Sequence, residues 1–330
     1  MLRLNGTDGR PFTFLLTGFS GLGAGHGPWL SIPMCFLYLV ALSGNCLILV
    51  VIKLHPSLHE PMYLFLSMLS LTDLGLSVST LPTVLQIYTF DSREISAEAC
   101  LAQLFFIHTF SIMESSVLLA MAFDRFVAIR HPLRYVSTLT RVRIGYIGLA
   151  IVLRGVGLHI PAPIMLKRLP YCKSHQLSHS YCLHPDMMKL ACADTTPNST
   201  YGLFVLLSTL GLDSMLIVLS YILILRTVLS IASREERSKA MSTCISHICA
   251  VLLFYTPLIS LSMIHRFWKK APPHTRILLS YLHFLVPPVL NPIVYGIKTQ
   301  QVRKQIIRLF RQKNLTRHRT ESFCIPVRVC

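Results

Sequence analysis

The stretch LSIPMCFLYLVALSGNCLILVVI, residues 30–52, decides the fold of this chain. It contains no charged residue and is long enough, as a helix, to cross a hydrocarbon core of roughly 30 Å. Six further apolar runs follow at residues 61–90, 101–123, 144–165, 201–225, 241–264 and 277–297. The sequence therefore predicts an all-α membrane protein built as a bundle of seven transmembrane helices.

Composition agrees with a membrane bundle and leaves little room for a soluble domain. The chain has 330 residues, of which 14% are charged, and its mean hydropathy is +0.56. A soluble domain of this size is normally more charged. Connections between the runs are short except at residues 167–200. We expect an extracellular segment at 1–27, the seven-span domain at 28–298, a short amphipathic eighth helix at 299–312 and a disordered cytoplasmic tail at 313–330.

The distribution of basic residues predicts the orientation in the membrane. The formal net charge is +17, and Lys and Arg gather in the segments that share a side with the C-terminus, at positions 53, 130, 134, 141, 143, 226, 234, 237 and 239 and in the tail. Cytoplasmic loops are enriched in these residues, so the N-terminus should lie outside the cell and the C-terminus inside. The remaining charge suits attraction to anionic membrane lipid. No basic soluble face is available for nucleic acid.

Four cysteines fall on the predicted outer side: Cys100, Cys172, Cys182 and Cys192. In an oxidising space they predict two disulfides, for which three pairings are open. On the same side Asn5-Gly6-Thr7 matches the acceptor sequence for N-glycosylation, so Asn5 is a candidate glycosylation site.

Polar residues inside the bilayer are candidate functional sites, because each costs a few kcal/mol to bury in lipid. Asp73, Glu114 and Asn291 lie near mid-depth of their spans. Two converging carboxylates need a cation or a shared proton, which predicts a sodium or proton site. A hydrogen-bonded network that only holds helices together is the alternative. Both interpretations predict that Asp73 faces Glu114.

Two more charges lie in the fourth and fifth spans. Arg154 is interpreted either as a hydrogen-bond donor to the bundle or as a lipid-facing residue, and its partner is not evident from the sequence. The role of Asp213 is equally open.

The string MAFDRFVAI, residues 121–129, ends the third span with the pair Asp124-Arg125. Arg is long enough to reach back to its neighbour and to adjacent helices. A salt bridge at this rim could hold the bundle shut, and a small change in pairing would open a cavity for a partner. The dipeptide carries this meaning only through its position at the end of a span.

Several strings accompany that pair. They are Gly44-Asn45, PMYLFL at 61–66, SLTD at 70–73, MAFDRFVAIRHPLRY at 121–135, Ser220-Tyr221, KAMSTCISH at 239–247 and NPIVY at 291–295. Together they resemble the olfactory branch of the rhodopsin-like G-protein-coupled receptors, over about residues 13–310. Phe123, Gly211-Leu212-Asp213 and the loop sequence SHSYC at 178–182 are similar to the class I, fish-like subgroup, closest to its family 51.

This resemblance implies a plasma-membrane receptor that binds a small odorant and activates a heterotrimeric stimulatory G protein, raising cyclic AMP. It also implies the Cys100–Cys182 link, which leaves Cys172 to pair with Cys192. The residues implied to switch the receptor are Asp124, Arg125, Tyr221, Tyr255, Pro257, Asn291, Pro292 and Tyr295.

Tyr255 stands two residues before Pro257, where many rhodopsin-like receptors carry a tryptophan, and is the expected rotamer switch. A proline inside a span kinks the helix, so Pro257 is expected to act as a hinge. The alternative is that it only shapes the bundle.

The predicted ligand site lies in the outer third of the bundle. His108 is about 12 Å below Cys100 at 1.5 Å per helical residue, and Arg266 lies near the outer end of the sixth span. Side chains lean toward the N-terminus of their helix, so these two should approach each other. Arg266, helped by His108 and Ser262, would then hold a small acidic or oxygenated ligand. The remaining wall is expected from Ile112, His159, Ala162, Leu206, Leu258 and Tyr281. In the alternative interpretation, Arg266 extends to lipid headgroups with Lys269 and Lys270, and His108 only bonds a backbone carbonyl.

On the inner side, Val302, Ile306, Leu309 and Phe310 fall on one face of a basic segment. This pattern predicts the eighth helix on anionic lipid. With Arg125, Tyr221 and Lys239, that helix would frame a cleft for the G protein.

An ion- or proton-coupled transporter or channel is the main rival, since Asp73, Glu114, Asp124 and Asp213 could relay ions. Repeated halves and matching broken spans are not evident in the sequence. An enzyme is disfavoured, because His108, His247 and His283 lie on different spans without metal-ligand spacing. We expect no cofactor other than a sodium ion or a proton.

Overall fold

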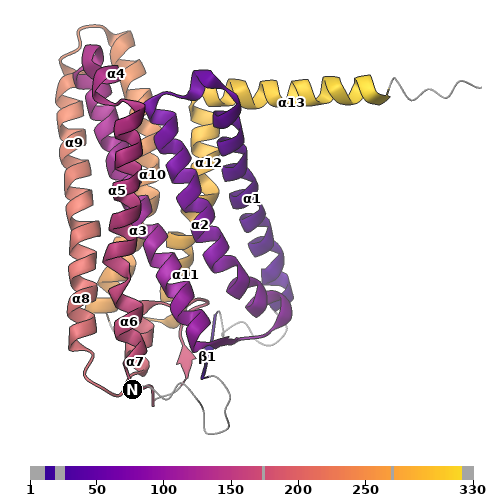
Figure 1. The fold of residues 1–330 in the computed structure, drawn as a ribbon, viewed down its shortest axis with the longest axis vertical. Helices are drawn as coiled ribbons and strands as arrows, with labels where there is room; N and C mark the ends of the chain where they lie inside the picture. Colours follow the sequence, from indigo (N-terminus) through magenta and orange to yellow (C-terminus); the bar gives the residue numbers. More distant parts are fainter. Residues whose placement is uncertain (1–11, 19–26, 173–174, 269–270, 322–330) are drawn as a thin grey trace, which may run out of the picture.

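The computed structural model describes residues 12–18, 27–172, 175–268 and 271–321. Within them, seven helices are long and apolar enough to cross a membrane. The prediction of a seven-helix membrane bundle is confirmed, and Figure 1 shows the helices side by side. These spans are Trp29–Leu54, Pro61–Phe90, Ala97–Arg130, Arg141–Lys167, Thr196–Leu229, Arg234–Phe267 and His274–Lys298.

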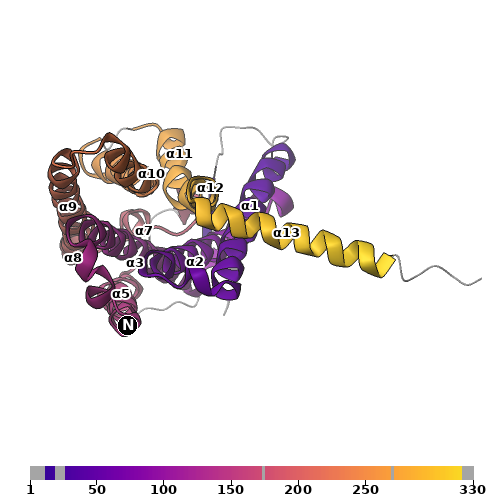
Figure 2. The ribbon, with the colours of Figure 1, turned by 90° about the horizontal axis from the view of Figure 1, so that it is seen from above.

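Four spans are single helices. They are α1 (Gly27–Leu54), α2 (Pro61–Phe90), α3 (Ala97–Arg130) and α10 (Arg234–Phe267). Helix α10 continues through Pro257. In Figure 2, α3 lies between α10 and the fourth span and packs against both. The third span therefore packs against the second, fourth, fifth and sixth spans.

Three spans expected as single helices are interrupted. The fourth divides into α5 (Arg141–His159) and α6 (Pro161–Lys167), because Pro161 has no N–H to continue the ladder. The fifth contains a π turn, Leu207–Gly211, between α8 (Thr196–Leu206) and α9 (Leu212–Leu229). The seventh divides at Leu285 into α11 (Pro273–Phe284) and α12 (Val286–Lys298). There Pro287 and Pro288 cannot donate to the carbonyls four residues earlier.

One end of the bundle carries a small sheet. Strand β1 (Thr13–Leu16) pairs antiparallel with β2 (Glu94–Ser96) and parallel with β3 (Gln176–Leu177). Phe14 is buried and its ring meets that of Tyr171 edge-on at 5.3 Å. We call this the sheet end. The short helix α7 (His184–Leu190) lies at the same end (Figure 1).

Two disulfides fasten the long loop at the sheet end. Cys100, in the first turn of α3, is bonded to Cys182, and Cys172 is bonded to Cys192. Their Cα–Cα separations are 5.4 and 5.9 Å, within the usual range for disulfides. The loop is therefore tied both to α3 and to itself. Asn5 lies outside the described residues.

The opposite end, which we call the α13 end, carries the short helix α4 (Tyr135–Thr138) and α13 (Gln300–Glu321). Figure 1 shows α13 leaving the bundle at a steep angle. Val302 is fully buried, and Tyr63 of α2 donates to Gln301 Oε1 at 2.9 Å. We expected disorder from residue 313, whereas α13 extends as far as Glu321, and no Pro or Gly interrupts residues 300–321. The side chain of Phe310 lies outside the described part.

The packing of α5 on α3 predicts an asymmetric effect of two alanine substitutions. A Cβ at Gly155 would lie 2.7 Å from Met113 Cγ and 3.2 Å from the backbone oxygen of Thr109, whereas a Cβ at Gly157 would meet nothing within 4 Å. We expect Gly155→Ala to lower the free energy of unfolding by about 1–3 kcal/mol through overpacking. Gly157→Ala should be neutral or slightly stabilising, since alanine favours helices. Thermal unfolding of the purified protein in detergent measures both, and equal effects would contradict the packing described.

Candidate functional site

A cavity of about 270 Å³ lies beneath α7 near the sheet end. This volume is close to the lower limit of roughly 300–1,000 Å³ that is usual for small-molecule sites. Helices α3, α5, α6, α8, α10 and α11 all contribute to its wall. Eight of the nine residues expected from the sequence line it: His108, Ile112, His159, Ala162, Leu206, Leu258, Ser262 and Arg266.

Tyr281, the ninth, is not part of the cavity wall. Its hydroxyl donates to Tyr88 Oη at 3.3 Å, and its ring meets Tyr181 edge-on at 5.6 Å. Helix α11 therefore turns this residue toward α2 and the disulfide-bonded loop. His283 and Phe284 of the same helix face the cavity instead.

The polar groups at the cavity differ in the hydrogen bonds they still offer. The His108 Nδ1 lies 2.9 Å from the Leu104 carbonyl, which can only accept, so Nδ1 carries the proton. The Nε2 atom of a neutral His108 is then an acceptor. Arg266 is exposed at the cavity, and no ion pair found among the described residues involves it. The cavity therefore has a permanent cation on its wall.

The loop and helix α7 that cover the cavity are held by polar contacts as well as by the disulfides. The Cys182 N–H donates to Gln103 Oε1 at 3.0 Å. His179 and Lys189 both contact the buried Asp186 carboxylate, Lys189 Nζ at 2.7 Å. Burial alone would raise the pKa of Asp186, but these two neighbours hold that pKa below its usual range. Helix α7 is thus fixed over the cavity.

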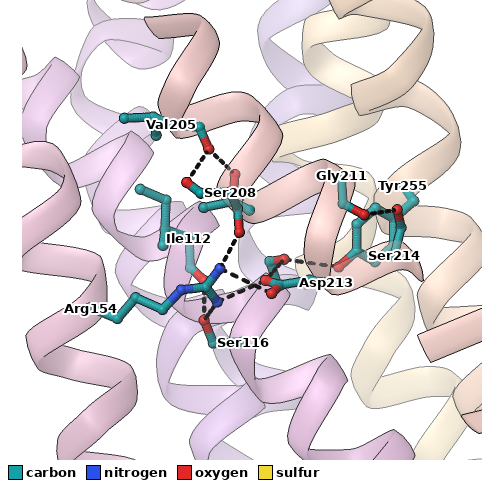
Figure 3. A network of polar contacts seen from close by, with 11 residues as sticks. Ile112, Ser116, Arg154, Val205, Ser208, Gly211, Asp213, Ser214 and Tyr255 are labelled. Carbon is teal, nitrogen blue, oxygen red and sulfur yellow. Dashed lines mark hydrogen bonds and ion pairs between the residues drawn. The ribbon is translucent and has the colours of Figure 1, made fainter. Parts of the chain in front are cut away.

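Below the cavity, Arg154 has a partner that the sequence did not identify (Figure 3). Its guanidinium donates to both Asp213 carboxylate oxygens, at 2.8 and 2.9 Å. It also donates to Ser116 Oγ at 2.6 Å and to the Ser208 carbonyl at 2.7 Å. Arg154 is therefore a bundle donor that joins α5 to α3 and to the fifth span. Ser208 belongs to the π turn, which no sequence pattern had indicated.

The same carboxylate reaches Tyr255 through one hydroxyl. Ser115 Oγ donates to Asp213 Oδ2 at 2.6 Å and lies 2.8 Å from Tyr255 Oη. Since Ser115 has a single hydroxyl proton, Tyr255 must be the donor in the second bond. Ser115 also lines the cavity. The expected switch residue thus hydrogen-bonds to a group on the cavity floor.

At the α13 end, the Asp124-Arg125 pair is formed. Arg125 Nε and one terminal nitrogen donate to Asp124 Oδ2 at 3.0 and 2.6 Å. Tyr135 Oη donates to the other carboxylate oxygen at 2.7 Å. Asp124 is therefore satisfied by its neighbour and by the segment that follows α3.

A second contact at the same end joins α9 to α10. His247 Nε2 lies 3.0 Å from the Leu118 carbonyl and must donate to it, so Nδ1 accepts from Tyr221 Oη at 2.6 Å. Tyr221 was expected as a switch residue and His247 was not. The string KAMSTCISH contains His247, but nothing in it shows that the residue bonds to two other helices. The side chain of Lys239 lies outside the described residues.

At mid-bundle, Asn291 Nδ2 donates to both oxygens of Asp73, at 3.2 and 3.1 Å. Glu114 is fully buried and close enough to Asp73 for their charges to interact. Asn291 also faces Glu114, although neither Glu114 oxygen has a partner at hydrogen-bond geometry among the described residues. Two other expected switch residues lie on the same helix as Asn291. Pro292 packs on Gly44. The buried Tyr295 hydroxyl has no hydrogen-bond partner among the described residues.

The ion pair below the cavity predicts a non-additive effect on stability. Arg154→Leu leaves Asp213, whose side chain is 1% exposed, as an uncompensated charge, which should cost roughly 3–5 kcal/mol of unfolding free energy. The double variant Arg154→Leu/Asp213→Leu should be more stable than Arg154→Leu alone. Thermal unfolding in detergent tests this difference. A double variant that is no better than the single one would show that the pair is not the source of the loss.

Comparisons with known proteins identify the family of the chain and support its seven-helix fold. A family model described as "Olfactory receptor" matches residues 34–313. Human olfactory receptor 51G2 is 64% identical over 298 residues, covering 90% of this chain and 95% of that protein. Human olfactory receptor 51I1 is 53% identical over 310 residues, covering 94% and 98%. The crystal structure of squid rhodopsin has a TM-score of 0.69 at 16% identity, over 87% of this chain and 85% of that one, and supports the fold. The chain belongs to the olfactory receptor family, whose members are G-protein-coupled receptors rather than enzymes.

Proposed function

We propose that this receptor recognises a small carboxylic acid in the cavity beneath α7 and signals through a stimulatory G protein to raise cyclic AMP. The supporting observation is Arg266, a cation without an ion-pair partner among the described residues, on a wall that is otherwise largely apolar. A guanidinium fork matches a carboxylate in shape and charge. Ser262, one turn away on α10, supplies a hydroxyl on the same wall.

The proposed orientation places the sheet end outside the cell and the α13 end in the cytoplasm. The disulfides belong to the sheet end, and disulfides persist in oxidising compartments. The exposed Arg303, Lys304 and Arg308 on α13 would then contact anionic lipid, while Val302 packs inward. This arrangement has the positive charge inside, as membrane proteins generally do.

Signalling in this proposal runs along α10. A ligand held by Arg266 and Ser262 pulls on the part of α10 that follows Pro257, and Tyr255 precedes that proline. Motion there would break the Tyr255–Ser115 bond and, farther along, the His247–Tyr221 bond. Those losses would separate α10 from α3 and α9 at the α13 end, where Arg125 would meet the G protein.

The acid-binding role of Arg266 predicts a selective loss of potency. Arg266→Ala should raise the half-maximal concentration of short and medium fatty acids by about tenfold to a hundredfold, as for a lost charge-assisted hydrogen bond. Arg168→Ala, which removes an exposed arginine that is not in the cavity wall, is the matched control. Cyclic AMP is measured at equal surface expression. Unchanged acid potency in Arg266→Ala would contradict the assignment.

Cyclic AMP and membrane current, measured in the same cells, distinguish a receptor from the rival channel or transporter. Ligand should raise cyclic AMP only when the stimulatory G protein is present. Current that follows ligand without that protein would support the rival.

We further propose that Asp73 and Glu114 hold a sodium ion or share a proton. Glu114 supports this proposal, since two buried carboxylate oxygens without partners in the described structure are costly unless neutralised. A hydrogen-bonded network that only holds the helices together is the alternative, since Asn291 interacts with both carboxyl groups.

Replacing external sodium with choline tests the mid-bundle site. If sodium binds, this replacement should change agonist potency in wild type, and Glu114→Gln should abolish the dependence. If a proton is shared, potency should be independent of sodium, and Glu114→Gln, which mimics the protonated acid, should signal normally while Glu114→Ala should not. Wild-type behaviour of Glu114→Ala would exclude both forms of the site.

A further inference from the structure

His159, the last residue of α5, is the feature of the cavity that acid recognition leaves unexplained. It is 3% exposed and lines the cavity. Both of its ring nitrogens are buried without a hydrogen-bond partner in the described structure. A neutral imidazole has one N–H donor and one acceptor, so His159 leaves both capacities unused.

Other histidines in this chain show how such a ring is usually satisfied. His55 and His108 each place Nδ1 at 2.9 Å from the carbonyl four residues earlier in the helix. His159 has a carbonyl at the same spacing and does not use it. Its ring instead stacks on His108, with centroids 4.8 Å apart and planes 3° apart. The side chain is therefore held by the cavity wall and not by its own helix.

A second histidine lies close to His159. His184 begins α7, is 7% exposed, lines the cavity and has an unpaired Nε2 in the described structure. Its ring rests against Gly202, where a Cβ would come within 3.2 Å of His184 Cε1. Both rings line the same cavity. Burial lowers the pKa of His184 to about 4, so the ring is neutral at physiological pH.

These two histidines lie apart from the cation. Arg266 and Ser262 belong to α10, and His159 belongs to α5, and these helices pack on different sides of α3 (Figure 2). The cavity therefore has Arg266 on α10 and His159 on α5 on different sides of α3, and its lining also includes His108, His265 and His283. Its remaining lining is mostly apolar and, among the residues described, includes no Asp or Glu.

We propose that His159 and His184 form a second polar subsite that binds a hydroxyl group, so that the preferred ligand is a hydroxy acid. This inference rests on the proposed recognition of a carboxylate by Arg266. A hydroxyl both donates and accepts, and so can satisfy an imidazole acceptor and an imidazole N–H together, whereas a carbonyl only accepts. An ammonium would find no carboxylate in the described wall, and a second carboxylate would face neutral rings.

The test compares straight-chain acids with hydroxy acids of equal length, moving the hydroxyl along the chain, by cyclic AMP response. In wild type, the best hydroxy acid should be about tenfold more potent than its plain counterpart, as for one or two hydrogen bonds. In His159→Phe, which keeps an aromatic ring without nitrogens, that ratio should fall to about one, with the plain acid still active. His159→Gln retains a donor and an acceptor and should keep part of the preference. His274→Phe, at an exposed position outside the cavity wall, is the control.

Equal potency of plain and hydroxy acids in wild type would overturn the inference without recourse to any variant. So would an unchanged ratio in His159→Phe. Failure of the proposed function looks different, because then neither class of acid gives a response that depends on Arg266.

Discussion

A charge buried in a membrane bundle must be neutralised from within, and in this receptor the carboxylate of Asp213 is such a charge. Arg154 donates to both of its oxygens, and Ser115 donates a third hydrogen bond to it. The remaining hydrogen bonds of Arg154 go to Ser116 Oγ and to a carbonyl of the π turn. Lipid tails compete with apolar side chains, so this polar network adds a connection between α3, α5 and the fifth span that lipid cannot replace. The cavity floor is built on this arrangement.

The direction of the hydrogen bonds around Asp213 decides what can move. Ser115 gives its proton to Asp213, so Tyr255 is only a donor to a hydroxyl oxygen that already has another bond. Releasing Tyr255 would break one neutral hydrogen bond, a net cost of about 0.5–1.5 kcal/mol, and would leave the ion pair intact. A small ligand can supply this much differential free energy between two conformations. Ser115 therefore joins the Arg154–Asp213 ion pair, which stays intact, to the Tyr255 hydrogen bond, which can break.

Sequence reasoning succeeded where a property is local to one helix. Apolar runs predicted the spans, and helical periodicity with the lean of side chains brought Arg266, Ser262 and His108 to one cavity. It failed where the result depends on irregular backbone. Tyr281 contacts Tyr88 of α2 from α11, the part of the seventh span before its break, and Ser208 reaches Arg154 from a π turn. The pairing of Arg154 with Asp213 depends on that turn as well as on the presence of the two charges. The sequence therefore identified both residues but did not predict their contact.

The disulfide-bonded loop and α7, which cover the cavity, explain how imidazoles on separate elements keep fixed positions in the cavity lining. His108 and Gln103 are on α3, Gln103 accepts from the backbone of Cys182, and Cys182 is bonded to Cys100 of the same helix. His184 follows Cys182 by two residues, so its position relative to His108 is set by a covalent bond and a hydrogen bond. His159 is set by stacking on His108. Side chains positioned in this way lose little freedom when a ligand binds, which favours affinity from few contacts. A small cavity of about 270 Å³ has few contacts to offer, so its selectivity must come from where its polar atoms are held.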